Sequence, residues 1–487
     1  MALPSSSADG ATPPIAVAAP GVAVETVALR RELGLSDLVF TQILFIVGLP
    51  WVGVAAKQGP AHVVFWLIAA ALFYVPSAIV VIYLNRLMPL EGGLYQWAKL
   101  GFNDRVGFLV AWNLWLFAIL NTSETGIQVT QYLVYVFGSS GTLLADNNLV
   151  IAAVSAIIFT ALVLLAIRGL SVGKWVHKSG GALMIGTFAA LLVLPWLNLA
   201  KGTIPSFHPL ATAAPVLSIM SLNLLGKMGF GAFGGFEYVA IHAGECRNPV
   251  RTIARSVVIA APIIAAMFIF GTSSVLALVP FDDIDLIAPI PQVLSAGFRP
   301  LGPVAWVAPV TILVLLVVRV AQASVMFTGN TRLPMVAGWD GVLPRWFTTL
   351  HVRYQTPVNS IVFVGSVTFA FSLIGMIGVG RQEAFQLLWN ASAIFYGLTY
   401  LVMFAIPIAG LSQLPARPPA WVRAAAASGF LMTLLYVTLS VLPIVTVNSR
   451  LTFAAKICGV IALTNAVGFA IYHRLNFSIS ARRQRHS

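Results

Sequence analysis

Apolar stretches long enough to cross a bilayer recur along the whole chain. A transmembrane helix needs about 20 consecutive, mostly apolar residues, because the hydrocarbon core is about 30 Å thick. Of the 487 residues, 59% are hydrophobic and only 9% are charged, which excludes a soluble globular protein. The sequence therefore predicts an all-α membrane protein with twelve spans, at residues 35–56, 63–87, 104–137, 149–167, 175–198, 218–243, 252–279, 302–331, 358–378, 384–410, 421–445 and 452–474.

The net charge of +13 follows the predicted loops and does not gather on one soluble face. Twenty of the 28 Lys and Arg residues fall in loops and tails assigned to one side, and six fall in the loops of the other side. Loops rich in Lys and Arg remain cytoplasmic. We therefore expect a multi-pass protein of the cytoplasmic membrane, in contact with lipid, with both termini cytoplasmic and no nucleic-acid partner.

The ends of the chain and its cysteines indicate no further domain. Residues 1–32 are rich in Ala, Pro and Ser and lack the pattern of a secretory signal, so we expect a disordered cytoplasmic tail. Residues 476–487 are expected to form a basic cytoplasmic tail. Cys246 and Cys458 fall in a predicted loop and in the last span, which offers no disulfide framework. No nucleotide-binding loop, dinucleotide fingerprint or zinc spacing occurs, so we expect no enzyme activity, cofactor or metal.

Two of the predicted spans contain residues that interrupt a helix. The first holds Gly48-Leu-Pro50-Trp-Val-Gly53, and the sixth holds Gly229-Phe-Gly-Ala-Phe-Gly-Gly-Phe-Glu237. Non-helical backbone at membrane depth is tolerated only where it is buried in protein or lines a water-filled cavity. The second break comes five spans after the first, which is the pattern expected of an inverted repeat with a solute site at its midplane. The alternative is a kinked helix or a closely packed glycine face.

Three loop motifs identify a family. Glu91-Gly-Gly-Leu-Tyr95 follows span two, Gly235-Phe-Glu-Tyr-Val-Ala-Ile-His-Ala-Gly-Glu-Cys-Arg-Asn-Pro249 ends span six, and Asp340-Gly-Val-Leu-Pro344 follows span eight. Their order and spacing resemble those of permeases of the amino acid–polyamine–organocation family, and the resemblance covers about residues 30–475.

The resemblance implies a LeuT-like core of five plus five inverted helices, in which helices 1 and 6 are discontinuous. The transporter domain would span residues 33–475. Its parts would be a first repeat at 33–200, a second repeat at 218–410 and two extra helices at 421–475.

The resemblance also implies where a substrate would bind. An amino acid carboxylate would meet backbone N–H groups at the first break, and its amino group would meet carbonyls at the second break. A carry-over along span three adds one side chain. The residues expected to contact substrate are Gly48, Pro50, Gly53, Thr122, Phe230, Gly231, Gly234 and Glu237.

Acidic residues inside predicted spans are candidates for function, because an ionisable group at membrane depth is expensive. Glu237 stands just after the second break and is expected either to contact a cationic group of the substrate or to carry a coupling proton. The alternative is a structural ion pair or a neutral hydrogen-bonded acid. Glu124 lies two residues beyond Thr122, about 200° around a helix, so the two side chains do not face one cavity squarely. Glu124 is left open between the cavity rim and helix packing.

Two cations lie within the predicted spans. Arg319 has two interpretations: its guanidinium replaces the ion that bridges helices 1 and 8 in sodium-coupled relatives of this fold, or it forms a buried pair with Glu124 or Glu237. The first interpretation predicts transport without sodium. Lys227 is expected to reach with its long stem toward the external headgroups.

The residues and the resemblance together predict a secondary active transporter of amino acids that works by alternating access, coupled to protons or by exchange. Its partner would be a small amino acid or amine. The alternatives are a polyamine carrier, for which Glu124 with Glu237 would supply a second acidic patch, and a sensor that binds solute without transporting it. The predicted external loop at 138–148 contains no cysteine, so we expect no disulfide-linked subunit.

Overall fold

The computed structural model describes residues 33–484, apart from residues 91, 247, 340–343, 377–379, 411–416, 446 and 448. The predicted N-terminal tail and the starts of two motifs, at residues 91 and 340, therefore lie outside the described residues. The last helix continues to Gln484, so the segment predicted as a basic tail begins as a continuation of that helix.

The described elements are helical, apart from an isolated β-bridge between Leu33 and Cys246. The first part of the chain forms α1 (Leu35–Ile46), α2 (Trp51–Ala56), the 3-10 turn η1 (Gly59–Ala61), α3 (His62–Ala69), the π turn η2 (Ala70–Tyr74), α4 (Val75–Leu87), α5 (Leu94–Gly101), α6 (Asp104–Ser123), α7 (Thr125–Phe137), α8 (Ser139–Ala145), α9 (Asn148–Arg168) and α10 (Leu170–Ala200).

The second part of the chain carries the second break and the remaining long helices. Its elements are α11 (Ile219–Gly226), the π turn η3 (Lys227–Ala232), the 3-10 helix η4 (Phe236–Glu245), α12 (Pro249–Leu278), η5 (Phe281–Asp283), α13 (Pro289–Phe298), η6 (Arg299–Val304), α14 (Val307–Trp339), η7 (Arg345–Thr348), α15 (Val358–Gly375), α16 (Arg381–Ala409), α17 (Ala420–Leu439) and α18 (Arg450–Gln484).

Within the described ranges, ten stretches of helix are long and apolar enough to cross a membrane. They correspond to η1 through α4, α6 with α7, and α9, α10, α12, α14, α15, α16, α17 and α18. The predicted spans at 35–56 and 218–243 are the two that are missing from this set, because each is divided into short helices by its break. The chain is therefore an all-helical, multi-pass membrane protein, with ten candidate membrane spans among its described residues.

Two predicted spans have different limits, and the sequence explains both differences. The span predicted at 302–331 begins at Val307, because Gly302 has a φ of +63° and Pro303 follows it in the separate turn η6. The span predicted at 421–445 ends at Leu439, four residues before Pro443, whose ring cannot continue a helix.

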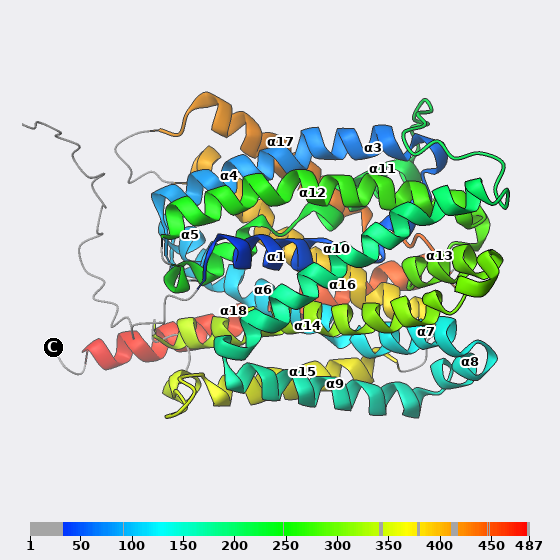
Figure 1. Cartoon of the computed structure of the whole chain (residues 1–487). Coiled ribbons are helices and arrows are strands. Elements are labelled where there is room, and N and C mark those ends of the chain that lie inside the picture. The colour runs from blue at the N-terminus through cyan, green and yellow to red at the C-terminus, as the bar shows by residue number, and fades with distance from the viewer. Residues whose placement is uncertain are drawn as a thin grey trace, which may run out of the picture. The chain divides into compact units, whose positions relative to one another are not determined.

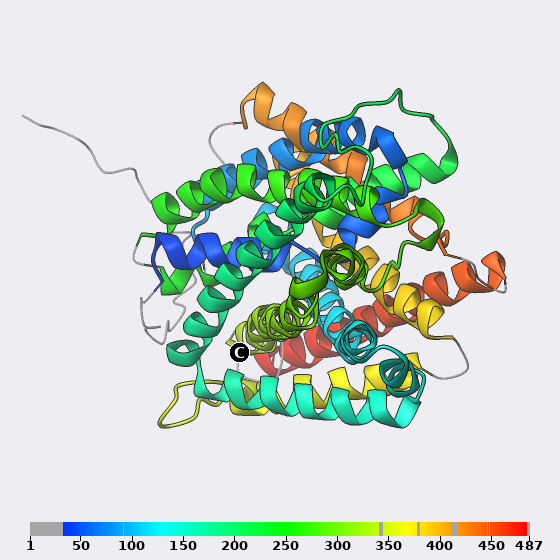
Figure 2. The ribbon, with the colours of Figure 1, turned by 45° about the vertical axis from the view of Figure 1, so that its right-hand side comes forward.

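The long helices run side by side, with the broken segments among them (Figure 1). In the most apolar windows of α6–α7 and of α16, 72% of the residues are buried, compared with 33% in α9 and 11% in α18. Helices α6 and α16 therefore form the centre, and α18 faces outward. Helix α1 packs against α10 and α12, and α9 pairs with α15 along one edge, as Figure 2 shows from a second direction.

Close packing between α16 and α17 gives a prediction about stability. A Cβ at Gly429 of α17 would lie 2.3 Å from the ring of Phe404 of α16, whereas a Cβ at Gly459 of α18 would meet nothing within 4 Å. We expect Gly429→Ala to destabilise the protein by about 1–3 kcal/mol through overpacking.

The matched control is Gly459→Ala, which should leave stability unchanged or raise it by up to about 1 kcal/mol through helix propensity. Thermal unfolding in detergent, followed by tryptophan fluorescence, measures both variants. Equal midpoints for the two variants would show that α16 and α17 do not pack as described.

Candidate functional site

The first break separates α1 from α2. Helix α1 ends at Ile46, Pro50 caps the start of α2, and the indole of Trp51 turns back over Gly48. A Cβ at Gly48 would lie 2.6 Å from this indole, so only glycine fits there. The break therefore depends on a proline that cannot donate a backbone hydrogen bond and on a glycine that leaves room for a ring.

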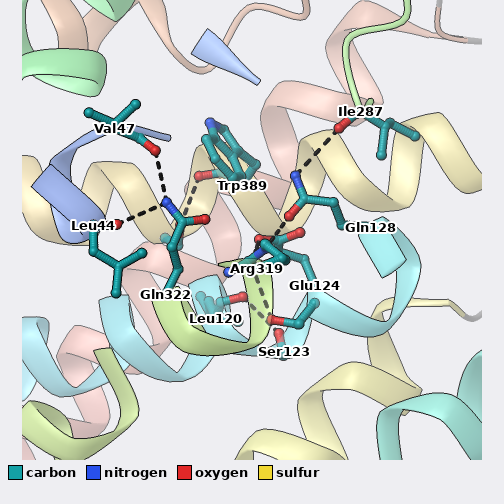
Figure 3. A network of polar contacts seen from close by, with 12 residues as sticks. Leu44, Val47, Leu120, Ser123, Glu124, Gln128, Ile287, Arg319, Gln322 and Trp389 are labelled. Atoms are coloured by element: carbon teal, nitrogen blue, oxygen red, sulfur yellow. Dashed lines mark hydrogen bonds and ion pairs between the residues drawn. The ribbon is translucent and has the colours of Figure 1, made fainter. Parts of the chain in front are cut away.

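The end of α1 exposes backbone carbonyls that a side chain from another helix satisfies. The last carbonyls of a helix have no donor within the helix. Gln322 of α14 donates from Nε2 to the carbonyls of Leu44 at 2.9 Å and Val47 at 2.8 Å (Figure 3). Sequence reasoning did not single out Gln322. The signal available was a polar residue inside a predicted span, one turn from Arg319.

The second break lies between η3 and η4. Gly235 has a φ of +136°, a conformation available only to glycine, and it donates its N–H to the Tyr400 hydroxyl at 2.7 Å. In an α-helix this N–H would bind the carbonyl of Gly231, which is therefore left without that donor. A Cβ at Gly231 would lie 2.5 Å from the Trp51 ring, so the two breaks touch each other.

Both breaks line one cavity of about 70 Å3, which is room for roughly five water molecules. Five of the residues predicted to contact substrate lie on its wall: Gly48, Pro50, Phe230, Gly231 and Gly234. Aromatic side chains of Trp51, Phe117 and Trp389 form much of the rest. The structure thus brings the two interruptions to a common hollow between the helices.

The other predicted residues lie behind this wall. Gly53 packs against Pro289, where a Cβ would lie 2.8 Å from the proline ring. Thr122 is buried with its hydroxyl unpaired, and its neighbour Asn121 lines the cavity instead. One residue turns a helix by 100°, so Thr122 faces a different direction from Asn121, and its contact with substrate stays a prediction. Glu124 is also not among the residues of the wall, and its carboxylate pairs with a partner side chain of another helix.

That partner is Arg319. Its Nη2 lies 2.5 Å from the Glu124 carboxylate and 3.1 Å from the Thr125 hydroxyl, and its Nε donates to Gln128 (Figure 3). The pair is buried, with 0% of the Glu124 side chain and 6% of the Arg319 side chain exposed. Arg319 also contributes to the cavity wall. Of the two interpretations of Arg319, the structure contains the ion pair with Glu124. The carbonyls at the end of α1, which the other interpretation assigned to Arg319, accept hydrogen bonds from Gln322.

Glu237 lines a second, smaller cavity together with Leu94 and Asn330. The hydroxyls of Tyr396 and Tyr400 both donate to its carboxylate. Tyr396 lines both cavities, and its ring stacks on Phe117 with centroids 4.0 Å apart. Glu237 is therefore separated from the first cavity by an aromatic pair.

Sequence reasoning missed the two tyrosines that hold Glu237. Tyr396 and Tyr400 stand four residues apart, so they lie on the same face of α16. Two phenols on one face of a predicted span were a usable signal for a buried acceptor.

The structure contradicts the expectation for Lys227. This side chain is only 1% exposed, and its Nζ donates to Oδ1 of Asn390 at 2.9 Å. It does not reach the lipid headgroups, because η3 is covered by α2, α3, α11 and α17. The prediction treated the start of span six as lipid-facing, whereas the break draws the whole segment into the centre.

Comparisons with known proteins agree with this architecture. The chain matches the family model for amino acid permeases over residues 33–464. An uncharacterized transporter of Legionella pneumophila is 24% identical over 80% of this chain and 83% of its own length. A probable agmatine/putrescine antiporter of Lactococcus lactis is 20% identical, with coverages of 75% and 77%. The human b(0,+)-type amino acid transporter 1 is 22% identical, with coverages of 93% and 90%. The chain belongs to the amino acid permease family, and it is a membrane transporter and not an enzyme.

Proposed function

We propose that this protein is a secondary active transporter that carries amino acids across the cytoplasmic membrane by alternating access, without sodium. The observation that carries the proposal is the cavity shared by the two breaks, with Gly48 and Pro50 on one side and Gly231 and Gly234 on the other. Backbone groups released from helical pairing in a buried hollow suit a polar solute that has lost its water.

A zwitterion fits the polarity of the two breaks. The start of α2, at Trp51, presents the positive end of a helix dipole, which favours a carboxylate. The Gly231 carbonyl, which lacks the donor it would have in an α-helix, offers an acceptor for an ammonium group. The substrate would then lie between Gly48 and Gly231, beneath the indoles of Trp51 and Trp389.

The charge of the wall favours amino acids over polyamines. Among the described residues of the wall, Arg319 is the one charged side chain. Two unit charges 5 Å apart repel by about 3 kcal/mol at an effective dielectric constant of 20. Glu124 offsets part of this repulsion, but neither Glu124 nor Glu237 faces the cavity to hold a second ammonium group. The Lactococcus lactis relative is named for agmatine and putrescine, so polyamine transport is the second candidate.

Gln322 supports transport without sodium. A cation bridging α1 and α14 would need free carbonyl oxygens at the end of α1. Those of Leu44 and Val47 already accept hydrogen bonds from the Gln322 amide. A neutral donor that is part of the protein thus stabilises the broken helix in place of an ion.

The proposal includes the topology that the sequence predicts. Adding the two broken segments to the ten continuous spans gives twelve crossings, with repeats at 33–200 and 218–410, extra helices at 421–475 and both termini in the cytoplasm. Two breaks support this scheme, one after Ile46 and one after Phe233, since each falls in the first segment of a proposed repeat.

Glu237 is assigned to closing the cavity and not to contacting substrate. Its carboxylate holds the hydroxyl of Tyr396, whose ring stacks on Phe117 between the two cavities. Releasing Tyr396 would join the two cavities into one path. A solute could then move along this path across the protein. Such net movement distinguishes a transporter from a sensor, which only binds the solute.

Uptake into proteoliposomes tests the function directly. We expect a radiolabelled neutral or acidic amino acid to accumulate equally in sodium and in choline buffers, and putrescine in excess to compete weakly. Binding without uptake would make the protein a sensor, and strong competition by putrescine would favour the polyamine carrier.

The contact between the two breaks gives a second prediction. We expect Gly231→Ala to reduce uptake strongly, because the added methyl group strains the site against Trp51 by about 1–3 kcal/mol. Gly186→Ala in α10 is the matched control, since a Cβ there meets nothing within 4 Å. Initial rates of uptake, normalised to the amount of folded protein, measure both. Equal rates would remove the contact from the mechanism.

The ion pair gives a third prediction. Arg319→Met leaves the Glu124 carboxylate buried without a partner, so we expect it to destabilise the protein by about 3–5 kcal/mol. Adding Glu124→Gln should restore the thermal midpoint by removing the unpaired charge. If Arg319 also repels cations, the double variant should be stable and should accept putrescine more readily than the native protein does. A double variant as unstable as Arg319→Met would contradict the pairing.

A further inference from the structure

Lys227 is a cation buried in the centre of the bundle, and none of the described carboxylates lies beside it. It is the first residue of the π turn η3, four residues before Gly231, and it is only 1% exposed. Removing an ammonium group from water costs several kcal/mol unless it is paired. A cation in such a place marks a functional group in a membrane protein.

The surroundings of Lys227 contain no charge that would hold its proton permanently. Its Nζ donates to Oδ1 of Asn390 at 2.9 Å and lies 5.7 Å from the centre of the Tyr436 ring. Among the described residues, no carboxylate lies within 4.0 Å of this nitrogen. Arg319 and Glu124, in contrast, hold each other at 2.5 Å.

The titratable groups on the neighbouring elements are bound elsewhere. Helices α2 and α11, which pack on η3, contain none. His62 of α3 lies 3.4 Å from Ser273, and Tyr74 of η2 donates to the Ala261 carbonyl. The two α16 tyrosines donate to Glu237. Tyr436 of α17 is left as the titratable neighbour that faces Lys227, through its ring.

The amide of Asn390 can serve both protonation states of Lys227. Its Oδ1 accepts from the ammonium group, whereas its Nδ2 is buried and has no hydrogen-bond partner. A neutral amine has a lone pair, so turning the amide by half a circle lets Nδ2 donate to it. Lys227 and Asn390 can therefore keep a hydrogen bond in both protonation states of the amine. An ion pair, in contrast, loses its attraction when the lysine loses its proton.

Both members of the pair are tied to the cavity that would hold the substrate. Asn390 follows Trp389, whose ring lies 5.1 Å from that of Trp51, and η3 leads directly to Gly231 beneath Trp51. Moving the sixth segment when the cavity opens would therefore move Lys227 relative to Asn390.

Building on the proposed transport function, we propose that Lys227 carries the proton that drives transport, with Asn390 as its switching partner. In the state open to the more acidic side, the Nζ lone pair of the neutral amine takes a proton from water. In the state open to the other side, one Nζ–H bond breaks, the proton goes to water there, and the amine is again neutral. One proton thus crosses in each cycle.

The first test compares Lys227→Met with Lys201→Met, an exposed lysine at the end of α10. In proteoliposomes with a pH-sensitive dye inside, the native protein and Lys201→Met should acidify the lumen during uptake. When the outside is made more acidic than the lumen, both should accumulate substrate inside. Lys227→Met should lose both the dye signal and the accumulation while still exchanging labelled for unlabelled substrate. Unchanged proton entry in Lys227→Met would overturn the inference. A result in which Glu237→Gln loses proton entry and Lys227→Met keeps it would assign the proton to Glu237.

The second test covers the case in which Lys227→Met does not fold. Asn390→Asp places a carboxylate beside the ammonium group, which favours the charged form, so release of the proton requires a higher pH. The pH midpoint of uptake should move upward by about 1–3 units. An unchanged midpoint would overturn the inference. Amino acid uptake by the native protein without proton entry would overturn this inference alone, whereas no uptake at all would overturn the proposed function.

Discussion

The structure depends on how backbone hydrogen bonds are completed where two helices stop inside the bundle. No water is available in the hydrocarbon region, and each unpaired backbone group there costs several kcal/mol. Gln322 completes the end of the first segment, and the Tyr400 hydroxyl accepts the N–H at the turn of the sixth. Both side chains come from central helices, so the breaks remain only while α14 and α16 stay in place. Gly231, whose carbonyl does not receive the Gly235 N–H, lines the cavity beside these repaired ends.

Four buried ionisable groups are stabilised in three different ways. Arg319 and Glu124 form an ion pair, Glu237 accepts hydrogen bonds from two tyrosine hydroxyls, and Lys227 donates a hydrogen bond to the amide of Asn390. A permanent pair fixes two helices to each other and resists a change of charge. A carboxylate or amine with neutral partners is less constrained, because its partners can accept either protonation state. Of the groups compared here, the two without an ionic partner, Lys227 and Glu237, lie on the sixth segment, which is also the segment interrupted by glycines.

Much of the fold could be predicted from the sequence, because apolar length and glycine–proline breaks act locally. Ten of the twelve predicted spans have limits within about four residues of the described helical segments, and both interruptions occur where Gly48, Pro50 and Gly235 stand. Side-chain roles were harder to predict. The environment of Lys227 depends on α16 and α17, more than 160 residues later in the chain, and no local pattern reports it.

The position of Thr122 shows how sensitive such a carry-over is to the rotation of a helix. A shift of one residue changes which side chain of α6 faces the cavity, and here Asn121 lines it. Gln322 was overlooked because its neighbour Arg319 carries the more conspicuous charge. A charge stands out in a hydropathy profile, whereas an amide that caps a distant helix becomes visible only when both helices are in place.

The indole of Trp51 resting on the bare backbone of Gly231 has a mechanical consequence. With no side chain between them, the first and the sixth segments are in direct contact, so a large movement of one segment displaces the other. This contact disfavours a state in which one segment has opened outward while the other has opened inward. The contact would then guard the membrane against a continuous leak, a task separate from recognising the cargo.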